Sequence, residues 1–553
     1  MKGKSLNNKD YFFKNVLILL FSQIIVKVVG LVYKLYLTNK EGFGDSGNAI
    51  YSSGFQIYAL LLTLSSTGVP NAIAKLVSER LAIGDTKGAH NIFKISFVTF
   101  AILGSIGTIF LFMGANFIAN VCLEIPEAEY TLIALSPSIL FVAISSVIKG
   151  YFNGMQNMKA TANSQTIEQI FKTLLTIILV EIVSKISFNN TILMAAGANL
   201  ATTMATFLGF AYLYKYYIER RKEIASEVKA STNNLPIRIR KTIKNILSVA
   251  MPISLSSIMS SFNRNIDSFT IVRILKKYIN ESEAKIQYGI LSGKVDILIM
   301  LPTAFNIAFI TPLVPEISSL TAKGNFEQVN KKINFALLIT ILIGLPSTIG
   351  MYIFAEPILA ILFPNATQGY KLLQLSSFIV IFTLVLQTIN ASLQGLGKNI
   401  VPAIALGVGM ICKLFCNIIL INIEKIGING AIIGNIMCNL VACIIGFHEL
   451  NKNMKIKINI IKIIFKPIIA TFIMSICSYS LYYRLKGIVF EKMATILAIV
   501  FAIIIYVISI LILKVFSKEQ IESLNIFKKL KNIWKINKFL KIKKDFIEDW
   551  RII

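Results

Sequence analysis

Long apolar runs separated by short polar stretches make up most of this 553-residue chain. Many of these runs are long enough for a helix to cross the hydrocarbon core of a bilayer, which takes about 20 residues. The segments of about ten alternating apolar and polar residues that mark a membrane β-barrel are absent from the sequence. The pattern predicts an all-α polytopic membrane protein, in agreement with a composition that is 55% hydrophobic and 15% charged.

Counting the apolar segments gives about fourteen transmembrane helices. They are expected near residues 14–37, 48–68, 92–116, 129–152, 162–184, 190–214, 245–271, 288–312, 333–355, 371–395, 399–421, 428–449, 463–484 and 492–514. Most Lys and Arg residues fall in the loops and ends on one side of this arrangement. Because cytoplasmic loops collect these residues, both termini are predicted to be cytoplasmic in a multi-pass protein of the bacterial cell membrane.

The first twelve predicted helices contain an internal repeat. A shift of about 240 residues places Gly84 on Gly324, Gly154 on Gly395, Lys172 on Lys413 and Gly197 on Gly434. An even number of helices separates the two copies, so both have the same orientation, as in transporters built from parallel repeats. The sequence predicts two pseudo-symmetric six-helix bundles plus two extra helices.

The expected organisation has five segments. They are an N-terminal six-helix bundle (1–217), a basic cytoplasmic linker (218–244), a C-terminal six-helix bundle (245–450), helices 13 and 14 (451–514) and a basic amphipathic cytoplasmic tail (515–553). Basic cytoplasmic segments contribute to the net charge of +28, and the linker and the tail each carry a net charge of +5. Basic residues beside spans contact anionic lipid, so membrane lipid is the expected partner and nucleic acid is not.

Charged residues inside the predicted spans are the candidate site. On helix 1, Lys27 and Lys34 share one polar stripe with Gln23 and Gly30. A lysine at the centre of a span costs about 2.5–3.5 kcal/mol, so Lys27 is predicted to face a cavity. Lys34 either faces the same cavity or extends to the outer interface.

Further charges lie on helices 7, 8 and 11. Helix 7 carries Arg264 and Asp267, which at i, i+3 either neutralise each other or face the cavity. Helix 8 adds Lys294 and Asp296, and helix 11 adds Lys413. Because the bases outnumber the acids, the sequence predicts an anionic substrate.

Glu168 and Lys172 on helix 5 have the i, i+4 spacing of a local salt bridge, which is the interpretation we favour. Gly409 stands where Glu168 would align in the second half, so Lys413 is expected to lack this partner and to be the better ligand. Substrate binding is therefore assigned to five residues: Lys27, Lys34, Arg264, Lys294 and Lys413. An ion-coupling or structural role is assigned to Asp267, Asp296, Glu168 and Lys172.

No acid–base constellation, metal-ligand spacing or phosphate-binding glycine loop is recognisable in the sequence. The chain is not expected to be an enzyme, and no catalytic residue, metal site, cofactor or ATP is predicted. Coupling to sodium or protons stays open.

Three stretches carry a resemblance to a known family. KGYFNGMQNMKATANSQTIEQIFK (149–172), TLSSTGVPNAIAKLVSERLAIGD (63–85) and VAMPISLSSIMSSFNRNID (249–267) look like the stage V sporulation protein B group of polysaccharide-transport proteins. This group belongs to the multidrug/oligosaccharidyl-lipid/polysaccharide exporter superfamily. The resemblance implies two six-helix bundles around a V-shaped cavity.

By similarity to bacterial lipid II flippases, the resemblance also implies movement of an undecaprenyl-pyrophosphate-linked peptidoglycan precursor to the outer leaflet. In those proteins basic residues on helices 1, 2 and 8 line the cavity. Lys27 is similar to one of them, Lys34 lies one position from another and Lys294 lies near the helix-8 site, whereas 48–68 contains no basic residue. Helices 13 and 14 are implied to hold the lipid tail, and cell-wall synthases are implied as partners.

Two alternatives stay open. A flippase for another lipid-linked oligosaccharide would keep the lysines. A multidrug or cation antiporter of the same fold would instead require Asp267, Asp296 or Glu168 and dispense with Lys27.

Overall fold

The computed structural model describes Val26 and residues 29–63, 68–155, 157–229, 231, 239–310, 313–454 and 461–516. Lys27 and all but the first two residues of the predicted basic tail lie outside this part of the chain. Contacts divide the chain into two compact units, Met1–Lys457 and Ile458–Ile553.

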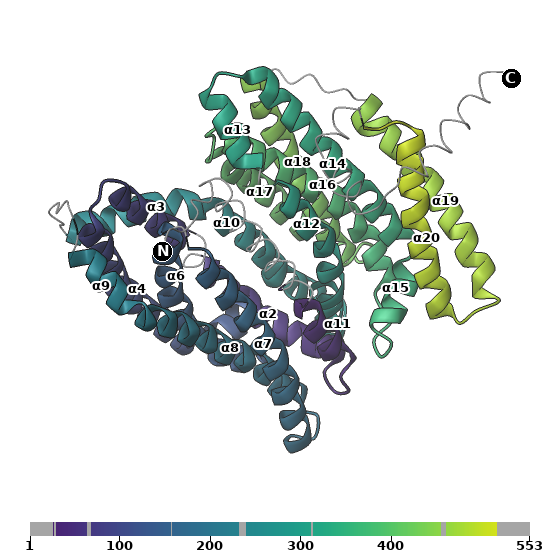
Figure 1. Cartoon of the computed structure of the whole chain (residues 1–553). Helices are drawn as coiled ribbons and strands as arrows, with labels where there is room; N and C mark the ends of the chain where they lie inside the picture. Colours follow the sequence, from purple (N-terminus) through teal and green to yellow (C-terminus); the bar gives the residue numbers. More distant parts are fainter. Residues whose placement is uncertain are drawn as a thin grey trace. The chain divides into compact units, whose positions relative to one another are not determined.

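The first half of the larger unit is built from a helix over residues 29–39 and the helices that follow it (Figure 1). These are α2 (Gly44–Thr63), α3 (Val69–Ala82), α4 (Thr86–Phe117) continued by the π-helical segment η2 (Ile118–Leu123), α5 (Ala128–Leu135), α6 (Ser138–Gly154), α7 (Lys159–Ile186) and α8 (Thr191–Glu219). The short helix α9 (Arg221–Lys229) follows, within the predicted linker.

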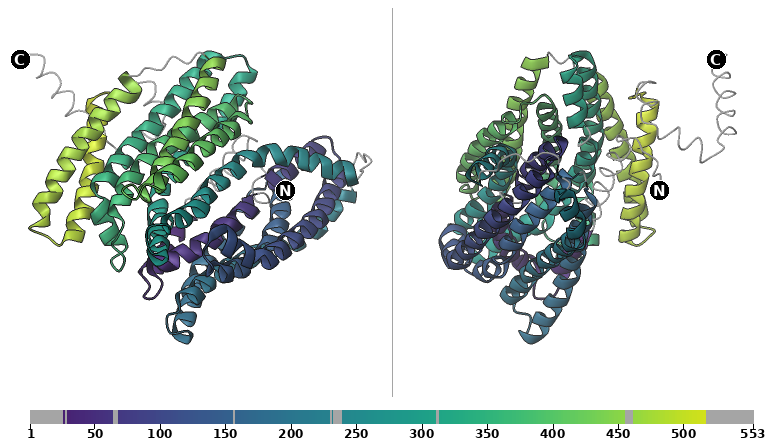
Figure 2. Two further views of the ribbon diagram at one scale, coloured as in Figure 1. Left: turned by 180° about the vertical axis from the view of Figure 1, so that it is seen from behind. Right: turned by 60° about the vertical axis from the view of Figure 1, so that its left-hand side comes forward.

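The second half begins at α10, six residues before the expected start of its bundle. Its helices are α10 (Ile239–Leu275), α11 (Glu281–Ile290), η3 (Leu291–Val295), α12 (Asp296–Ile310), α13 (Leu313–Ala322), α14 (Phe326–Ile353), α15 (Ala355–Leu362), α16 (Tyr370–Gly395), α17 (Val401–Ile421) and α18 (Asn429–Met454). In the left-hand view of Figure 2, the purple-to-blue helices of the first half and the green helices of the second half form separate groups.

Helix packing repeats between the two halves. In the first half α3, α4 and α6 pack on one another, and α7 packs along α8. In the second half α13, α14 and α16 make the same set of contacts, and α17 packs along α18. The repeated contacts match the internal repeat found in the sequence.

The smaller unit consists of η4 (Ile461–Phe465), α19 (Lys466–Lys486) and α20 (Glu491–Ile512), and α19 packs along α20. The Lys466 ammonium donates a hydrogen bond to the carbonyl oxygen of Leu513 at 2.8 Å, and Lys486 forms an ion pair with Glu491 at 2.8 Å. These contacts close both ends of the helical hairpin.

All regular elements in the part of the chain that the structure describes are helices. Ten of them are long and apolar enough to cross a membrane. They correspond to all the predicted spans except helices 1, 2, 5 and 7. Helices 2, 5 and 7 are present as α2, α7 and α10, so the helical multi-pass fold is confirmed. Helices α7 and α10 carry four of the candidate charged residues: Glu168, Lys172, Arg264 and Asp267.

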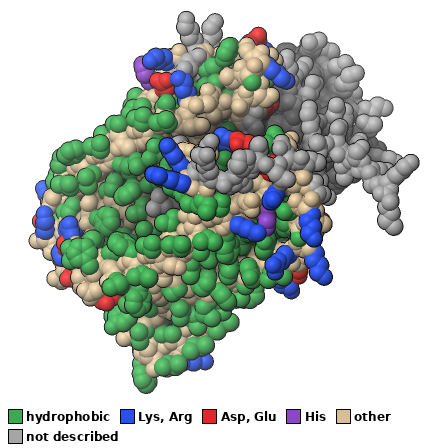
Figure 3. Space-filling model, turned by 90° about the vertical axis from the view of Figure 1, so that its left-hand side faces the viewer, with side chains coloured by type: hydrophobic (Ala, Val, Ile, Leu, Met, Phe, Trp, Pro, Cys, Tyr) green, Lys and Arg blue, Asp and Glu red, His purple; other side chains and the backbone are tan. Residues whose placement is uncertain are grey.

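Apolar side chains cover much of the outer surface. Figure 3 shows a broad hydrophobic area on one face, with most of the Lys and Arg side chains lying away from it. Helix α4 alone has eight apolar residues that are more than half exposed: Val98, Ile102, Ile106, Ile109, Phe110, Phe112, Met113 and Phe117. A surface of this kind is stable in contact with lipid rather than with water.

Candidate functional site

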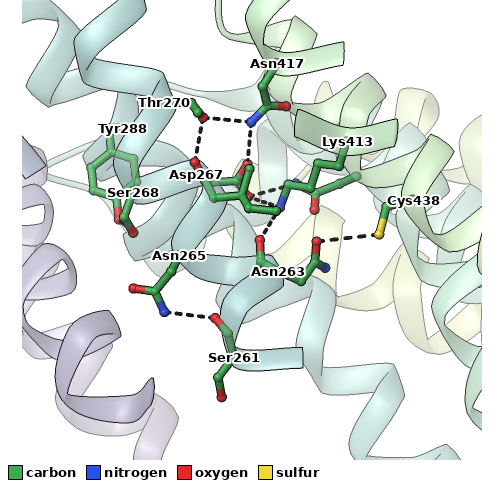
Figure 4. A network of polar contacts seen from close by, with 12 residues as sticks. Ser261, Asn263, Asn265, Asp267, Ser268, Thr270, Tyr288, Lys413, Asn417 and Cys438 are labelled. Atoms are coloured by element: carbon green, nitrogen blue, oxygen red, sulfur yellow. Dashed lines mark hydrogen bonds and ion pairs between the residues drawn. The ribbon is translucent and has the colours of Figure 1, made fainter. Parts of the chain in front are cut away.

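The second half contains a polar network between α10, α17 and α18 (Figure 4). The Lys413 ammonium lies 2.7 Å from Asp267 Oδ2 and donates a second hydrogen bond to the carbonyl oxygen of Asn263 at 2.5 Å. The Lys413 side chain is fully buried and that of Asp267 is 15% exposed. An ion pair this deep costs much desolvation energy, which close geometry and further hydrogen bonds must offset.

Two amide side chains complete the surroundings of Asp267. Asn417 donates to Asp267 Oδ1 at 3.1 Å and to Thr270 Oγ1 at 2.9 Å, while Asn435 donates to Asp267 Oδ2 at 3.1 Å. Both carboxylate oxygens are therefore satisfied by donors from α17 and α18. Neither asparagine was singled out from the sequence, although an amide in an apolar helix requires a partner there.

Lys413 has Gly409 in place of the partner that would correspond to Glu168, but it has an acidic partner, Asp267, on another helix. The local pair of Arg264 with Asp267 is absent. Arg264 Nη2 instead donates to Ser261 Oγ at 3.3 Å, and Ser261 shares a 2.7 Å hydrogen bond with Thr63 of α2. Packing of α17 against α10 places Lys413 opposite Asp267, and spacing within one helix cannot show this.

Asp296 lies near the same network at the start of α12. The residue is half-buried, and its carboxylate interacts electrostatically with Asp267, Lys413 and Arg264. The structure thus brings four of the predicted site residues of the second half together.

Lys294 lies at a different place, where the two halves meet. Its side chain is fully buried in η3 and forms a 2.9 Å ion pair with Asp45 at the start of α2. Its ammonium also donates to the carbonyl oxygens of Ala366 and Gln368, both at 2.8 Å. Asp45 was not among the predicted residues, because the sequence places it in a loop before helix 2.

Other ion pairs join the halves at this end of the unit. Lys285 of α11 lies 2.7 Å from Glu127, and Arg273 of α10 lies 2.6 Å from Glu124, which also pairs with Lys276. Although partial burial opposes it, hydrogen bonds from Lys276 and Arg273 lower the pKa of the Glu124 carboxyl group. These contacts hold the two halves closed at one end.

In the first half, Lys34 and Lys172 lie against aromatic rings. Lys34 Nζ is 3.9 Å from the centre of the Tyr51 ring, and Lys172 Nζ is 4.5 Å from that of Phe55 and 5.2 Å from that of Tyr33. Lys34 is only 8% exposed, so the alternative in which its side chain extends to the outer interface is wrong. The three rings, of which Tyr51 and Phe55 belong to α2 and Tyr33 to the helix before it, were not predicted.

The predicted salt bridge between Glu168 and Lys172 is not formed. The Glu168 carboxylate lies 4.0 Å from Lys149 of α6, while Lys172 points to the aromatic rings. The i, i+4 spacing makes the pair possible, but the packing of α6 on α7 offers Glu168 another base.

Lys27, which the sequence predicts to face the cavity, lies outside the described residues.

A family model described as polysaccharide biosynthesis protein matches residues 12–321, more than half of the chain. The chain belongs to this polysaccharide biosynthesis protein family. A second family model, MatE, matches residues 252–419. The family resemblance inferred from the sequence is thereby confirmed.

Two relatives from Bacillus subtilis (strain 168) match most of the chain. The lipid II flippase MurJ is 24% identical over 455 residues, which cover 80% of this chain and 82% of the relative. Stage V sporulation protein B is 25% identical over 461 residues, which cover 82% of this chain and 86% of the relative. The name of the first relative describes a flippase.

Solved structures share the fold. A lipid II flippase MurJ in an inward closed conformation superimposes with a TM-score of 0.66 at 16% identity, covering 89% of this chain and 98% of the other. An inward-facing multidrug resistance transporter of the MATE family also gives a TM-score of 0.66, at 17% identity, covering 79% of this chain and 98% of the other. The chain therefore has the multi-pass helical fold of these membrane transporters.

Proposed function

We propose that the chain is a flippase that moves an undecaprenyl-pyrophosphate-linked cell-wall precursor, with lipid II as the favoured substrate, from the inner to the outer leaflet. The observation that carries the proposal is the set of buried lysines inside membrane helices: Lys34, Lys172, Lys294 and Lys413. Buried basic groups in a membrane are costly and mark pathways for charged substrates. The two Bacillus subtilis relatives support the same function.

The substrate crosses the membrane through an alternating-access cycle of the two halves. The anionic head group enters between the two halves from the cytoplasm, and rocking of the halves exposes it outside. The ion pairs between Lys294 and Asp45 and between Lys285 and Glu127 must break for this to happen. With both termini cytoplasmic, these pairs lie on the outer side, and the described state is closed there.

The membrane potential favours this direction of transport. An inside-negative potential drives negative charge outward by about 2.3 kcal/mol per charge per 100 mV. Helices α19 and α20 are proposed to guide the polyprenyl tail. Cell-wall synthases that consume the product are the expected partners.

Cells depleted of their own lipid II flippase provide the test. Wild-type chain and a Lys172→Met variant are expressed at matched levels, and the fraction of lipid II accessible to an externally added degrading enzyme is measured. Restoration by the wild type supports the proposal. If correctly inserted wild type restores nothing, lipid II is not the substrate.

A drug or cation antiporter is the second candidate, because Asp267 and Asp296 lie in membrane helices and the MATE fold is shared. Export of a cationic dye from intact cells separates the two functions. An antiporter would lose export with Asp296→Asn and keep it with Lys172→Met.

A further inference from the structure

A cavity of about 770 Å³ lies where the two halves meet, beside the ion pair of Lys294 with Asp45. Its first wall is the segment 38–46, which joins the first helix to α2. Its second wall is the segment 364–368 between α15 and α16, together with Ile286 of α11. Small-molecule sites typically enclose about 300–1,000 Å³, so the cavity is large enough for such a ligand.

Contacts between the two walls assemble the cavity. Asn39 Nδ2 donates a hydrogen bond to the carbonyl oxygen of Leu362, and Asn365 Nδ2 donates to the carbonyl oxygen of Asn39, both at 2.8 Å. The Lys294 ammonium joins Asp45 of the first wall to carbonyl oxygens of the second wall. These contacts break when the halves separate, so both walls face one ligand only while this side is closed.

Uncharged hydrogen-bonding groups dominate the lining of the cavity. They are the side chains of Thr38, Asn39, Ser46, Asn365, Thr367 and Gln368. Of the three charged residues in the lining, Asp45 pairs with Lys294. Lys40 pairs with Glu181 at 2.8 Å, which leaves Glu41 as the third. A lining of this kind matches an uncharged polar ligand rather than an anion.

Three of the lining groups are free to bind a ligand. The hydroxyl groups of Ser46 and Thr367 and the side-chain amide of Gln368 make no hydrogen bond within the described part of the chain. Hydroxyl and amide groups each donate and accept hydrogen bonds. Sugar hydroxyl groups do the same, so a sugar ring can pair with such a lining in both directions.

We infer that this cavity binds an uncharged sugar on the outer side of the membrane and that the bound sugar holds that side closed. Both walls contact the ligand only in the closed state, so binding shifts the equilibrium toward that state. Since export requires the outer side to open, sugar outside the cell slows the cycle. The sugar site is independent of the proposed function, whereas this brake on export rests on it.

Binding by the purified full-length protein, in a detergent without a sugar head group, tests the site. N,N′-diacetylchitobiose and its anomeric phosphate are titrated by calorimetry in separate arms, with N-acetylalanylalaninamide as an uncharged peptide. The disaccharide is expected to bind and the peptide is not. Tighter binding of the anomeric phosphate would assign the site to the head group of a lipid-linked sugar, and equal or weaker binding would assign it to a free glycan.

Variants that lack a single hydroxyl group test the lining. Ser46→Ala and Thr367→Val are each expected to weaken disaccharide binding about fivefold, equivalent to the loss of one hydrogen bond of about 1 kcal/mol. Ser282→Ala is the matched control, because it removes an exposed hydroxyl group of α11 outside the lining. Melting temperatures without ligand should be unchanged in all three variants, since none of these hydroxyl groups has a partner in the described part of the chain.

The brake on export is measured in cells depleted of their own lipid II flippase that express this chain. The disaccharide is added outside at a concentration equal to its dissociation constant. It should lower the initial rate at which lipid II becomes accessible by about twofold, because half of the closed protein is then occupied. The double variant Ser46→Ala/Thr367→Val should keep the basal rate and lose this inhibition.

The inference is wrong if the wild type does not bind the disaccharide, if the peptide binds instead, or if Ser46→Ala and Thr367→Val bind the disaccharide as well as the wild type. Binding without any slowing of export would overturn the brake. Failure of the proposed function looks different. In that case the disaccharide would still bind to the purified protein, but the chain would not restore accessible lipid II in cells.

Discussion

At the scale of single residues, the pair formed by Asp267 and Lys413 is the contact most sensitive to change. Asp267→Asn leaves a fully buried ammonium without its carboxylate, so we expect a loss of about 3–5 kcal/mol in stability. The additional Lys413→Met change should recover most of this loss, because no charge then remains buried. Thermal unfolding of the purified single and double variants measures both effects.

The result would contradict the structure if Asp267→Asn alone were neutral. A double variant that is less stable than Asp267→Asn alone would also contradict the structure, since the two side chains would then act independently.

The Glu124 carboxyl group makes the stability of the folded protein depend on pH. Its carboxyl pKa is lowered in the folded protein, so the stabilisation by Arg273 and Lys276 is complete above the usual pKa of 4.5 and disappears as the pH falls through the lower, folded value. We therefore expect Glu124→Gln to melt at a lower temperature than the wild type at pH 7. Below pH 4.5 the two melting curves should converge, and a constant difference at all pH values would exclude this origin.

The sequence identified most of the charged residues but not their partners. Lys413, Lys294 and Lys172 stand out because each is a base in an apolar run. Their contacts with Asp267, Asp45 and Phe55 come from other helices, separated by more than a hundred residues. Spacing along one helix favours neighbours at i, i+4, and this is why a pair of Glu168 with Lys172 was expected where Lys149 intervenes.

At the scale of helices, α2 and α11 approach each other closely because glycine lies between them. A Cβ atom on Gly289 would lie 1.9 Å from the carbonyl oxygen of Asp45. Gly289→Ala must therefore push α2 away, and we expect it to cost about 1–3 kcal/mol in stability. Gly350→Ala in α14 is the matched control, since its Cβ meets nothing within 4 Å.

Thermal unfolding distinguishes the two glycine variants. The control should be neutral or stabilised by about 0.5–1 kcal/mol, because alanine favours a helix interior more than glycine. Equal melting temperatures for the two variants would mean that the halves are not in close contact at Gly289.

The strongly apolar helices could be predicted from the sequence, and their interruptions could not. Helix 4 was expected as one span, yet it is divided into α5 and α6 around Pro137, which cannot donate a backbone hydrogen bond. Helix 8 contains η3, whose π-helical turn brings Lys294 to Asp45. The hydrophobic pattern is the same in a straight helix and in one with such a turn.

At the scale of the whole molecule, the repeat was the most informative feature of the sequence. It predicted two bundles of equal orientation, and the helix contacts recur accordingly in both halves. The repeat did not predict which half carries unpaired charge, because Lys172 and Lys413 align with each other while their surroundings differ.

The division into two units predicts the effect of truncation. Residues Met1–Lys457 form a compact unit, so a chain ending at Lys457 should keep its helical content and its cooperative melting. If α19 and α20 guide the lipid tail, this shortened chain should bind pyrophosphate normally and fail to flip lipid II. Circular dichroism, calorimetry and the cell assay measure the three properties, and normal flipping would exclude the role of the two helices.

The three oxygen ligands of Lys294, from Asp45, Ala366 and Gln368, have a consequence for the speed of opening. They replace the water molecules that an ammonium ion would otherwise hold, so separating the two halves at this point requires rehydration of the ion. The opening rate should then depend on water activity. A solute too large to enter, which draws water out of the protein interior, would slow each cycle without occupying the site.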